Sequence, residues 1–188
     1  MSFAHIDLAL AERADHLAAH HDGIEDAASH YATASEALFA VGLVALIAIA
    51  LLTRHRRAAL GGVLAGAAAA VGLAAGAVVA GLVSRPRPFV AHHDITAFIA
   101  HAPDPGFPSD HAVAALAIAT MLMLRFGVRG LPVLIAAIAL AASRVFVGVH
   151  YPGDVLAGAL IGVVAALAVD RIARAPWPAA RLAAIGAG

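Results

Sequence analysis

The chain has 188 residues, of which 62% are hydrophobic and only 13% are charged. Soluble globular domains carry about 25% charged residues, so this composition favours an integral membrane protein. The formal net charge of zero argues against nucleic acid as a partner, and the absence of cysteine excludes disulfides, thiol chemistry and cysteine metal sites. Lysine is also absent, and the abundance of alanine and glycine suggests a GC-rich bacterial genome.

The N-terminal stretch, residues 1–23, mixes apolar side chains with charged ones and is too polar to cross a membrane. It contains no continuous apolar core, so a cleavable signal peptide is not indicated. The pattern predicts an amphipathic helix that lies at the membrane interface. A partly ordered tail and a sixth membrane span are the alternatives.

Five long apolar runs follow, and each is near the roughly 20 residues needed to cross about 30 Å of hydrocarbon. They cover residues 31–53, 58–83, 109–125, 131–147 and 154–170. Because lipid does not tolerate an open sheet edge, these runs are expected to be helices. The sequence therefore predicts an all-α integral membrane fold over residues 1–188, a single domain of five clear transmembrane helices plus the N-terminal helix.

Most arginines gather on one side of the predicted bundle. With five spans, this side carries Arg54, Arg56, Arg57, Arg125, Arg129, Arg171, Arg174 and Arg181. Cytoplasmic segments of membrane proteins are enriched in basic residues, so this side is predicted to be cytoplasmic, with residues 172–188 as a cytoplasmic tail. Residues 84–108 then form an extracytoplasmic loop.

Three polar stretches stand at the ends of the apolar runs, namely Arg85–Pro88, Pro108–His111 and Ser143–Asp154. Ionisable groups at the edge of hydrocarbon are costly unless they are paired or functional. Because the five-span topology brings all three stretches to the outer side, we expect them to form one site. The loop 84–108 is too long for a simple connector, which favours a role in that site.

The third stretch contains Ser143-Arg144, then His150 after five residues and Asp154 after three more. It matches in full the third motif of the type 2 phosphatidic acid phosphatase superfamily. Pro108–His111 resembles the second motif of that superfamily, Pro-Ser-Gly-His. Arg87 and the proline after it match the end of the first motif, in which a lysine precedes Arg-Pro by six residues.

Within this superfamily, Arg85–His93 and Phe107–His111 resemble the bacitracin-resistance type of undecaprenyl-diphosphate phosphatase. The resemblance covers roughly residues 24–172. It implies an enzyme that hydrolyses undecaprenyl diphosphate to undecaprenyl phosphate and inorganic phosphate through a phosphohistidine, which recycles the lipid carrier of cell-wall synthesis. It also implies a reaction without metal or other cofactor. Together with the arginine pattern, it predicts the bacterial cytoplasmic membrane, with the active site on the extracytoplasmic face.

Two positions depart from the pattern of the superfamily. The first-motif lysine would fall at Ala80, so one phosphate ligand is missing, and Arg85 is the candidate replacement. Asp110 stands where the wider superfamily has glycine. Because a carboxylate would repel a bound phosphate, we expect the Asp110 side chain to turn away and cap the helix, while its N–H faces the ligand.

The motif side chains also suit phosphoryl transfer on chemical grounds. His150 is the predicted nucleophile, and Asp154 is predicted to accept the other ring N–H of His150 and fix its tautomer. His111 is the predicted general acid for the leaving group and then the base for water. Arg87 and Arg144 offer planar guanidinium groups that fit phosphoryl oxygens. A purely structural role at a helix end is the alternative for each.

Further phosphate ligands are predicted where the third span begins. Ser109 would contribute a hydroxyl, and the unpaired backbone N–H groups of that helix start would contribute donors and the positive end of the helix dipole. Ser109 as a simple N-cap is the alternative. The predicted phosphate-binding set is Arg87, Ser109, Asp110, Arg144, Arg85 and Ser143.

The long loop contains a group of potential metal ligands, His92, His93, Asp94, His101 and Asp104. Their spacing is irregular, and the resembled family is regarded as metal-independent, so no metal site is predicted. The loop is instead expected to shape the headgroup entrance and to recognise the second phosphate of a diphosphate.

The predicted partners are polyprenyl diphosphate or another lipid phosphate, together with membrane lipids, and no oligomeric state is predicted. A phosphatase for phosphatidylglycerophosphate, phosphatidate or another lipid phosphate, and a lipid phosphotransferase, are alternatives on the same scaffold. A small-anion membrane transporter is an alternative of another class, against which the apolar centre of the bundle argues. A soluble haloperoxidase would share the motifs, but five apolar spans argue against it.

Overall fold

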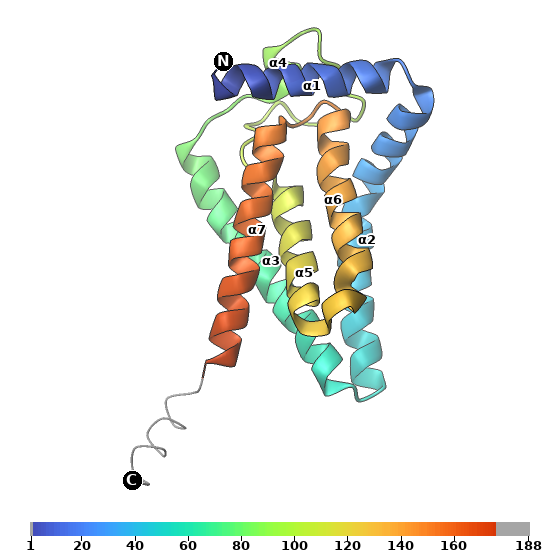
Figure 1. Cartoon of the computed structure of the whole chain (residues 1–188), viewed down its shortest axis with the longest axis vertical. Helices are drawn as coiled ribbons and strands as arrows, with labels where there is room; N and C mark the ends of the chain where they lie inside the picture. The colour runs from blue at the N-terminus through green and yellow to red at the C-terminus, as the bar shows by residue number, and fades with distance from the viewer. Residues whose placement is uncertain (1, 176–188) are drawn as a thin grey trace.

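The structure is a computed structural model that describes residues 2–175 of the chain. Within these residues the regular structure is entirely helical (Figure 1). The elements are α1 (Phe3–Ala19), α2 (Asp22–Leu52), α3 (Arg56–Leu82), α4 (Pro88–Ala91), α5 (Asp110–Phe126), the 3-10 turn η1 (Gly127–Gly130), α6 (Leu131–Phe146) and α7 (Pro152–Arg174).

The five predicted apolar runs each form a long helix, which confirms the all-α membrane bundle. Four stretches of the described chain are long and apolar enough to cross a membrane, namely α2, α3, the stretch from α5 through α6, and α7. The third stretch reverses at η1, so that α5 and α6 run side by side (Figure 1). The bundle therefore has five long helices, and α2 begins at Asp22, two turns or more before the predicted apolar run at residue 31.

The reversal between α5 and α6 depends on two glycines. Gly127 ends α5 with a φ of +59°, a conformation that side chains with a Cβ rarely adopt. A Cβ at Gly130 would lie only 2.8 Å from the backbone nitrogen of Met123. The turn can therefore fold tightly against the last part of α5.

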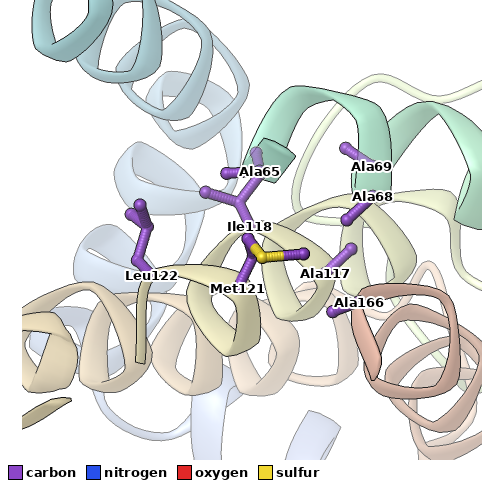
Figure 2. Close-up of a cluster of buried hydrophobic side chains, with 8 residues drawn as sticks. All are labelled: Ala65, Ala68, Ala69, Ala117, Ile118, Met121, Leu122 and Ala166. Carbon is purple, nitrogen blue, oxygen red and sulfur yellow. The ribbon is translucent and has the colours of Figure 1, made fainter. Parts of the chain in front are cut away.

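The centre of the bundle is built from small side chains. Figure 2 shows alanines of α3, α5 and α7 packed against a few larger residues of α5, in a cluster of Ala65, Ala68, Ala69, Ala117, Ile118, Met121, Leu122 and Ala166. A Cβ at Gly162 of α7 would clash with the Val113 carbonyl oxygen of α5. Small residues allow such close approach of helices in lipid. The same approach brings the first turns of α5 and α7 together.

Helix α1 lies across the end of the bundle, over the last turn of α6, the first turn of α7 and the connection between them (Figure 1). Its buried face consists of Asp7, Ala11, Ala14, Asp15 and Ala18, at helical spacing. It is not among the stretches that could cross a membrane, so the structure does not support a sixth span. Its position at the membrane interface stays a prediction.

The segment between α3 and α5 is mostly irregular, as predicted, but it contains the short helix α4. Pro88 stands at the first position of α4, where its missing N–H costs nothing. At the other end of the chain, residues 172–174 continue α7. The rest of the predicted cytoplasmic tail, apart from residue 175, lies outside the described residues.

Candidate active site

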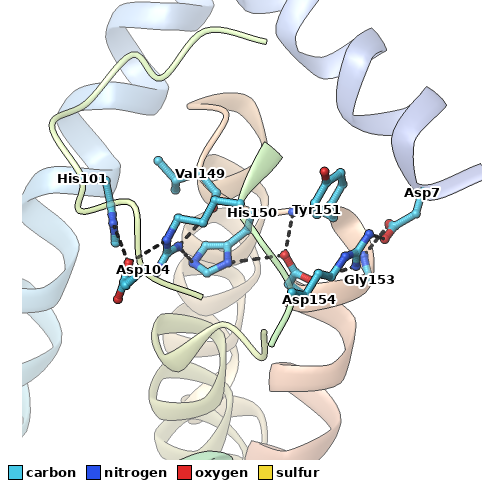
Figure 3. A network of polar contacts seen from close by, with 10 residues as sticks. Asp7, His101, Asp104, Val149, His150, Tyr151, Gly153 and Asp154 are labelled. Atoms are coloured by element: carbon cyan, nitrogen blue, oxygen red, sulfur yellow. Dashed lines mark hydrogen bonds and ion pairs between the residues drawn. The ribbon is translucent and has the colours of Figure 1, made fainter. Parts of the chain in front are cut away.

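The three polar stretches meet at one end of the bundle. The Ser109 N–H donates to the Asp154 carbonyl oxygen at 3.1 Å, which joins the start of α5 to the start of α7. Arg87 Nη1 donates to the Val149 carbonyl oxygen at 3.1 Å, which joins the first stretch to the third. The structure therefore brings the predicted motifs into one cluster. Figure 3 shows the polar contacts around His150 and Asp154 of the third motif.

His150 and Arg87 are both buried in this cluster, with exposed fractions of 2% and 5%. Arg87 Nη1 lies 3.0 Å from His150 Nε2. A guanidinium only donates hydrogen bonds, so Nε2 must be the acceptor and the ring proton of the neutral imidazole must be on Nδ1. This tautomer leaves the lone pair of a potential nucleophile on Nε2.

Asp154 Oδ2 lies 3.7 Å from His150 Nδ1, on the side of the ring opposite Arg87. This distance is too long for a hydrogen bond, and Nδ1 has no hydrogen-bond partner among residues 2–175. Asp154 instead accepts from the Tyr151 N–H at 2.9 Å and from Arg85 Nη1 at 2.9 Å. The predicted His150–Asp154 pair is therefore adjacent in space, but its predicted hydrogen bond is not formed.

Burial lowers the pKa of the His150 imidazole below its ordinary value. The positive charges of Arg87 and Arg144 act in the same direction, while the Asp154 carboxylate opposes the shift. His150 is consequently neutral at neutral pH, which is the form in which imidazole is a nucleophile.

Two buried donors at this end of the bundle lack partners within the described residues. Arg144 is 2% exposed, its Nε has no hydrogen-bond partner, and it forms no ion pair with a carboxylate among the described residues. The Ser109 hydroxyl is fully buried and also lacks a partner within residues 2–175. Buried polar groups are nearly always satisfied, so these donors point to a ligand rich in acceptor oxygens. A phosphoryl group fits this description.

His111 stands in the first turn of α5, at the same end of the bundle as His150. Its Nε2 lies 3.7 Å from Glu36 Oε2 of α2, and its side chain is partly exposed. Arg144, His150 and Arg87 are among the charged or titratable groups that act on it electrostatically. This position is suitable for a group that exchanges protons with a ligand held near His150.

Three predicted phosphate ligands have other surroundings. The Arg85 guanidinium is occupied by Asp154 at 2.9 Å and by Asp7 at 2.6 Å, so its geometry does not support the predicted replacement of the missing lysine. The Ser143 hydroxyl donates to the Leu140 carbonyl oxygen at 2.8 Å, which satisfies it within α6. Ser109 occupies the N-cap position of α5, as one alternative predicted, but this helix has no side-chain cap hydrogen bond, so the predicted cap by the Asp110 carboxylate is not formed.

The potential metal ligands of the long loop do not converge. Within the described residues no group of three or more His, Asp or Glu side chains is placed to hold a metal ion. The His92 ring packs edge-on against Tyr151 at 6.3 Å, whereas the His101 ring packs edge-on against His150 at 6.5 Å. Asp104 accepts from Arg87 Nε at 3.0 Å, and this bond lowers the pKa of Asp104.

Sequence reasoning missed Asp7, Asp104 and His101 as parts of this network. Asp7 reaches the site from α1, far from the motifs in sequence. The available signal was the helical spacing of Asp7 and Asp15 with small alanines, which indicates that this face of α1 is the buried one.

Comparisons with known proteins identify the family of this chain and several of its relatives. A family model described as the PAP2 superfamily matches residues 60–177. The chain is 35% identical to undecaprenyl-diphosphatase BcrC of Bacillus subtilis over 81% of this chain and 77% of that protein. It is 36% identical to decaprenylphosphoryl-5-phosphoribose phosphatase of Mycobacterium tuberculosis over 69% of this chain and 70% of that protein.

Among solved structures, LpxE of Aquifex aeolicus has a similar fold, with a TM-score of 0.72 at 22% identity. The match covers 87% of this chain and 94% of that protein. The family match includes the second and third motifs and the first-motif Arg87, and it extends over more than half of the chain. The chain therefore belongs to the PAP2 superfamily.

Proposed function

We propose that this protein is a membrane lipid phosphatase that hydrolyses undecaprenyl diphosphate to undecaprenyl phosphate and inorganic phosphate. The observation that carries the proposal is the buried His150 Nε2, which points its lone pair at Arg87 beside the unpartnered donors of Arg144 and Ser109. The similarity to undecaprenyl-diphosphatase BcrC supports the choice of substrate.

In the first step, His150 Nε2 attacks the terminal phosphorus of the diphosphate. The phosphoryl oxygens take the hydrogen bonds of Arg87, which frees the Nε2 lone pair, and they also satisfy Arg144 and Ser109. A P–N bond forms as the P–O bond to the lipid phosphate breaks. His111 gives a proton to the departing oxygen, and the negative charge of Asp154 stabilises the ring that keeps its Nδ1 proton.

In the second step, water hydrolyses the phosphohistidine. His111, now neutral, takes a proton from the water as its oxygen attacks phosphorus, and the P–N bond breaks. Inorganic phosphate leaves, and His150 returns to its neutral form with the proton on Nδ1. Neither step needs a group beyond the side chains at this end of the bundle.

The proposed location is the bacterial cytoplasmic membrane, with the site on the extracytoplasmic face. The arginines of the α2–α3 turn, the α5–α6 turn and the end of α7 lie at the end of the bundle opposite the site. The positive-inside rule supports a cytoplasmic position for that end. The enzyme would then regenerate the lipid carrier of cell-wall synthesis where its diphosphate form is released.

A lipid monophosphate phosphatase is the second candidate. The unpartnered donors, Arg144 Nε and the Ser109 hydroxyl, are sufficient to satisfy one phosphoryl group. The similarity to decaprenylphosphoryl-5-phosphoribose phosphatase supports this candidate as well. Substrate comparison distinguishes the two functions.

The test is phosphate release by the full chain in detergent, with a chelator present and no added metal. The substrates are undecaprenyl diphosphate, undecaprenyl phosphate, phosphatidylglycerophosphate and phosphatidate. We expect the diphosphate to be hydrolysed fastest. A higher kcat/KM for a monophosphate would replace the first candidate with the second.

The proposed nucleophile is tested with His150→Ala, which should lower kcat by about 10⁴-fold or more and abolish the labelled phosphoenzyme trapped by acid quenching. His93→Ala is the matched control, because His93 is an exposed histidine of the neighbouring loop. Normal turnover in the His150 variant would remove the proposed mechanism.

A further inference from the structure

Asp7 of α1 is a buried carboxylate that the proposed reaction does not yet use. It is 3% exposed, although it belongs to a helix that crosses the outside of the bundle end (Figure 1). One of its oxygens lies 2.6 Å from Arg85 Nη2, and the other accepts from the Gly153 N–H at 2.7 Å. Asp7 therefore contacts both the first polar stretch and the first turn of α7.

Arg85 connects Asp7 to the centre of the site. Its Nη1 donates to Asp154 Oδ1 at 2.9 Å, and its guanidinium lies 3.8 Å above the Tyr151 ring. The other oxygen of Asp154 faces His150 Nδ1. Figure 3 shows Asp7, Asp154 and His150 in a row, and the Arg85 guanidinium joins Asp7 to Asp154.

Helix α1 and the first turn of α7 are in close contact at Asp7. A Cβ at Gly153 would lie 2.7 Å from Asp7 Oδ2, so the first turn of α7 rests directly on this carboxylate. Asp154 is the next residue of that turn. Asp7 therefore fixes the position of the backbone that carries Asp154.

The charges in this row have a chemical consequence. Arg85 alone would neutralise Asp154, and the carboxylate would then offer little negative charge to His150. Asp7 supplies a second carboxylate to the same guanidinium, so the three groups together keep one net negative charge beside His150 Nδ1. This charge stabilises the positive imidazole ring that forms when Nε2 binds phosphorus.

We propose that Asp7 is a positioning residue that holds Arg85 and the first turn of α7, so that Asp154 remains oriented and negatively charged toward His150. This inference rests on the proposed phosphohistidine reaction. The family model matches residues 60–177, so Asp7 lies outside the matched part of the chain and contacts it from α1.

The test uses the full chain in detergent with undecaprenyl diphosphate as the substrate. Asp7→Asn keeps an oxygen that can accept the Gly153 N–H but removes the charge that pairs with Arg85. We expect kcat to fall by about tenfold to a hundredfold, the size of effect seen when a group that positions a functional side chain is removed. KM should change less than about twofold, because the phosphate ligands Arg87 and Arg144 do not contact Asp7.

Two further variants distinguish charge from folding. Asp7→Glu keeps the charge and should regain part of the lost kcat. The double variant Asp7→Asn with Arg85→Gln restores the net charge around Asp154 and should have a higher kcat than Asp7→Asn alone. A double variant no faster than the single one would overturn the charge argument, even if Asp7→Asn proved unstable.

Asp15→Asn is the matched control for the docking of α1. Asp15 lies on the same buried face, is 9% exposed and accepts the Thr96 N–H at 2.8 Å, but it pairs with no arginine among residues 2–175. Its kcat should stay near that of the wild type. An equal loss in both variants, or a wild-type kcat in Asp7→Asn, would overturn the inference. An inactive wild type would instead refute the proposed function.

Discussion

Two arginines in the bundle, one near each end, differ in their partners. Arg125, in the last turn of α5, has its Nη2 2.8 Å from Asp170 Oδ1 of α7. Arg144, in the last turn of α6, is 2% exposed and is paired with no carboxylate among the described residues. The positive charge of Arg125 is therefore neutralised within the protein, whereas that of Arg144 requires an anion from outside.

This difference separates a structural end of the bundle from a functional one. A buried cation without a counterion is costly in a membrane protein, so its presence indicates a ligand that supplies the missing charge. The separation of the two ends rests on the ion pair rather than on hydrogen bonds, because Arg125 Nε also lacks a hydrogen-bond partner within residues 2–175. The distinction can be tested by removing one arginine at a time.

Removing Arg144 should have the largest effect on activity. Arg144→Ala should lower kcat/KM for undecaprenyl diphosphate by about 10³-fold, as expected when a donor to a developing phosphoryl charge is lost. Its thermal stability in detergent should not decrease, because no ion pair is broken. Steady-state kinetics and a thermal unfolding curve measure the two quantities.

Arg125→Ala is the matched variant at the other end, and the opposite result is expected. Hydrolysis should continue near the wild-type rate, while the free energy of unfolding falls by about 1–3 kcal/mol because the buried Asp170 loses a partner. Arg174 Nε, 2.7 Å from Asp170, limits this loss. If Arg125→Ala impaired activity as strongly as Arg144→Ala, the assignment of the two ends would be wrong.

Two serines at the same end of the bundle as Arg144 can be compared in the same way. Both hydroxyls are buried, but that of Ser143 donates to Leu140 and that of Ser109 donates to nothing within residues 2–175. Ser109→Ala should lower kcat/KM by about tenfold to a hundredfold, the value of a hydrogen bond to a charged group. Ser143→Ala should leave kcat/KM nearly unchanged, and equal losses in both would contradict the assignment.

The helices and the cluster of motifs could be predicted from the sequence because each depends on a local pattern. Apolar runs of about 20 residues determine the spans. Arg87 and Ser109 share the loop between two runs, and the two runs between Ser109 and His150 return the chain to the same side. The narrow spacing of the third motif also places His150 and Asp154 within one turn of each other. These relations do not need the tertiary contacts.

The pairing of charges could not be predicted, because it depends on contacts between residues far apart in sequence. The sequence predicts that Arg85 binds phosphate, yet its guanidinium is paired with Asp7 of α1, which stands 78 residues earlier in the chain. Asp154 was expected to bond directly to His150, yet Arg85 and the Tyr151 N–H occupy its oxygens. A sequence identifies the charged groups, whereas the packing of α1 on α7 decides which of them remain available.

The smallest expected effect concerns the stability of the protein in acid. It tests whether the pKa of His150 is lowered in the folded protein. Burial lowers the pKa of His150, assisted by Arg87 and Arg144 and opposed by Asp154. Below the ordinary histidine pKa of about 6.5, the unfolded chain therefore binds a proton at this residue that the folded chain does not bind. Folding stability must then decrease as the pH falls through that value.

His150→Ala removes this contribution and should lose less stability than the wild type between about pH 7.5 and about pH 5.5. Thermal unfolding in detergent at the two pH values measures the difference. His93→Ala, at an exposed position, should lose as much stability as the wild type. Equal acid sensitivity of the wild type and His150→Ala would show that His150 is not held neutral by burial. The nucleophile would then have to be neutralised by the substrate itself, since a protonated imidazole has no lone pair on Nε2 with which to attack phosphorus.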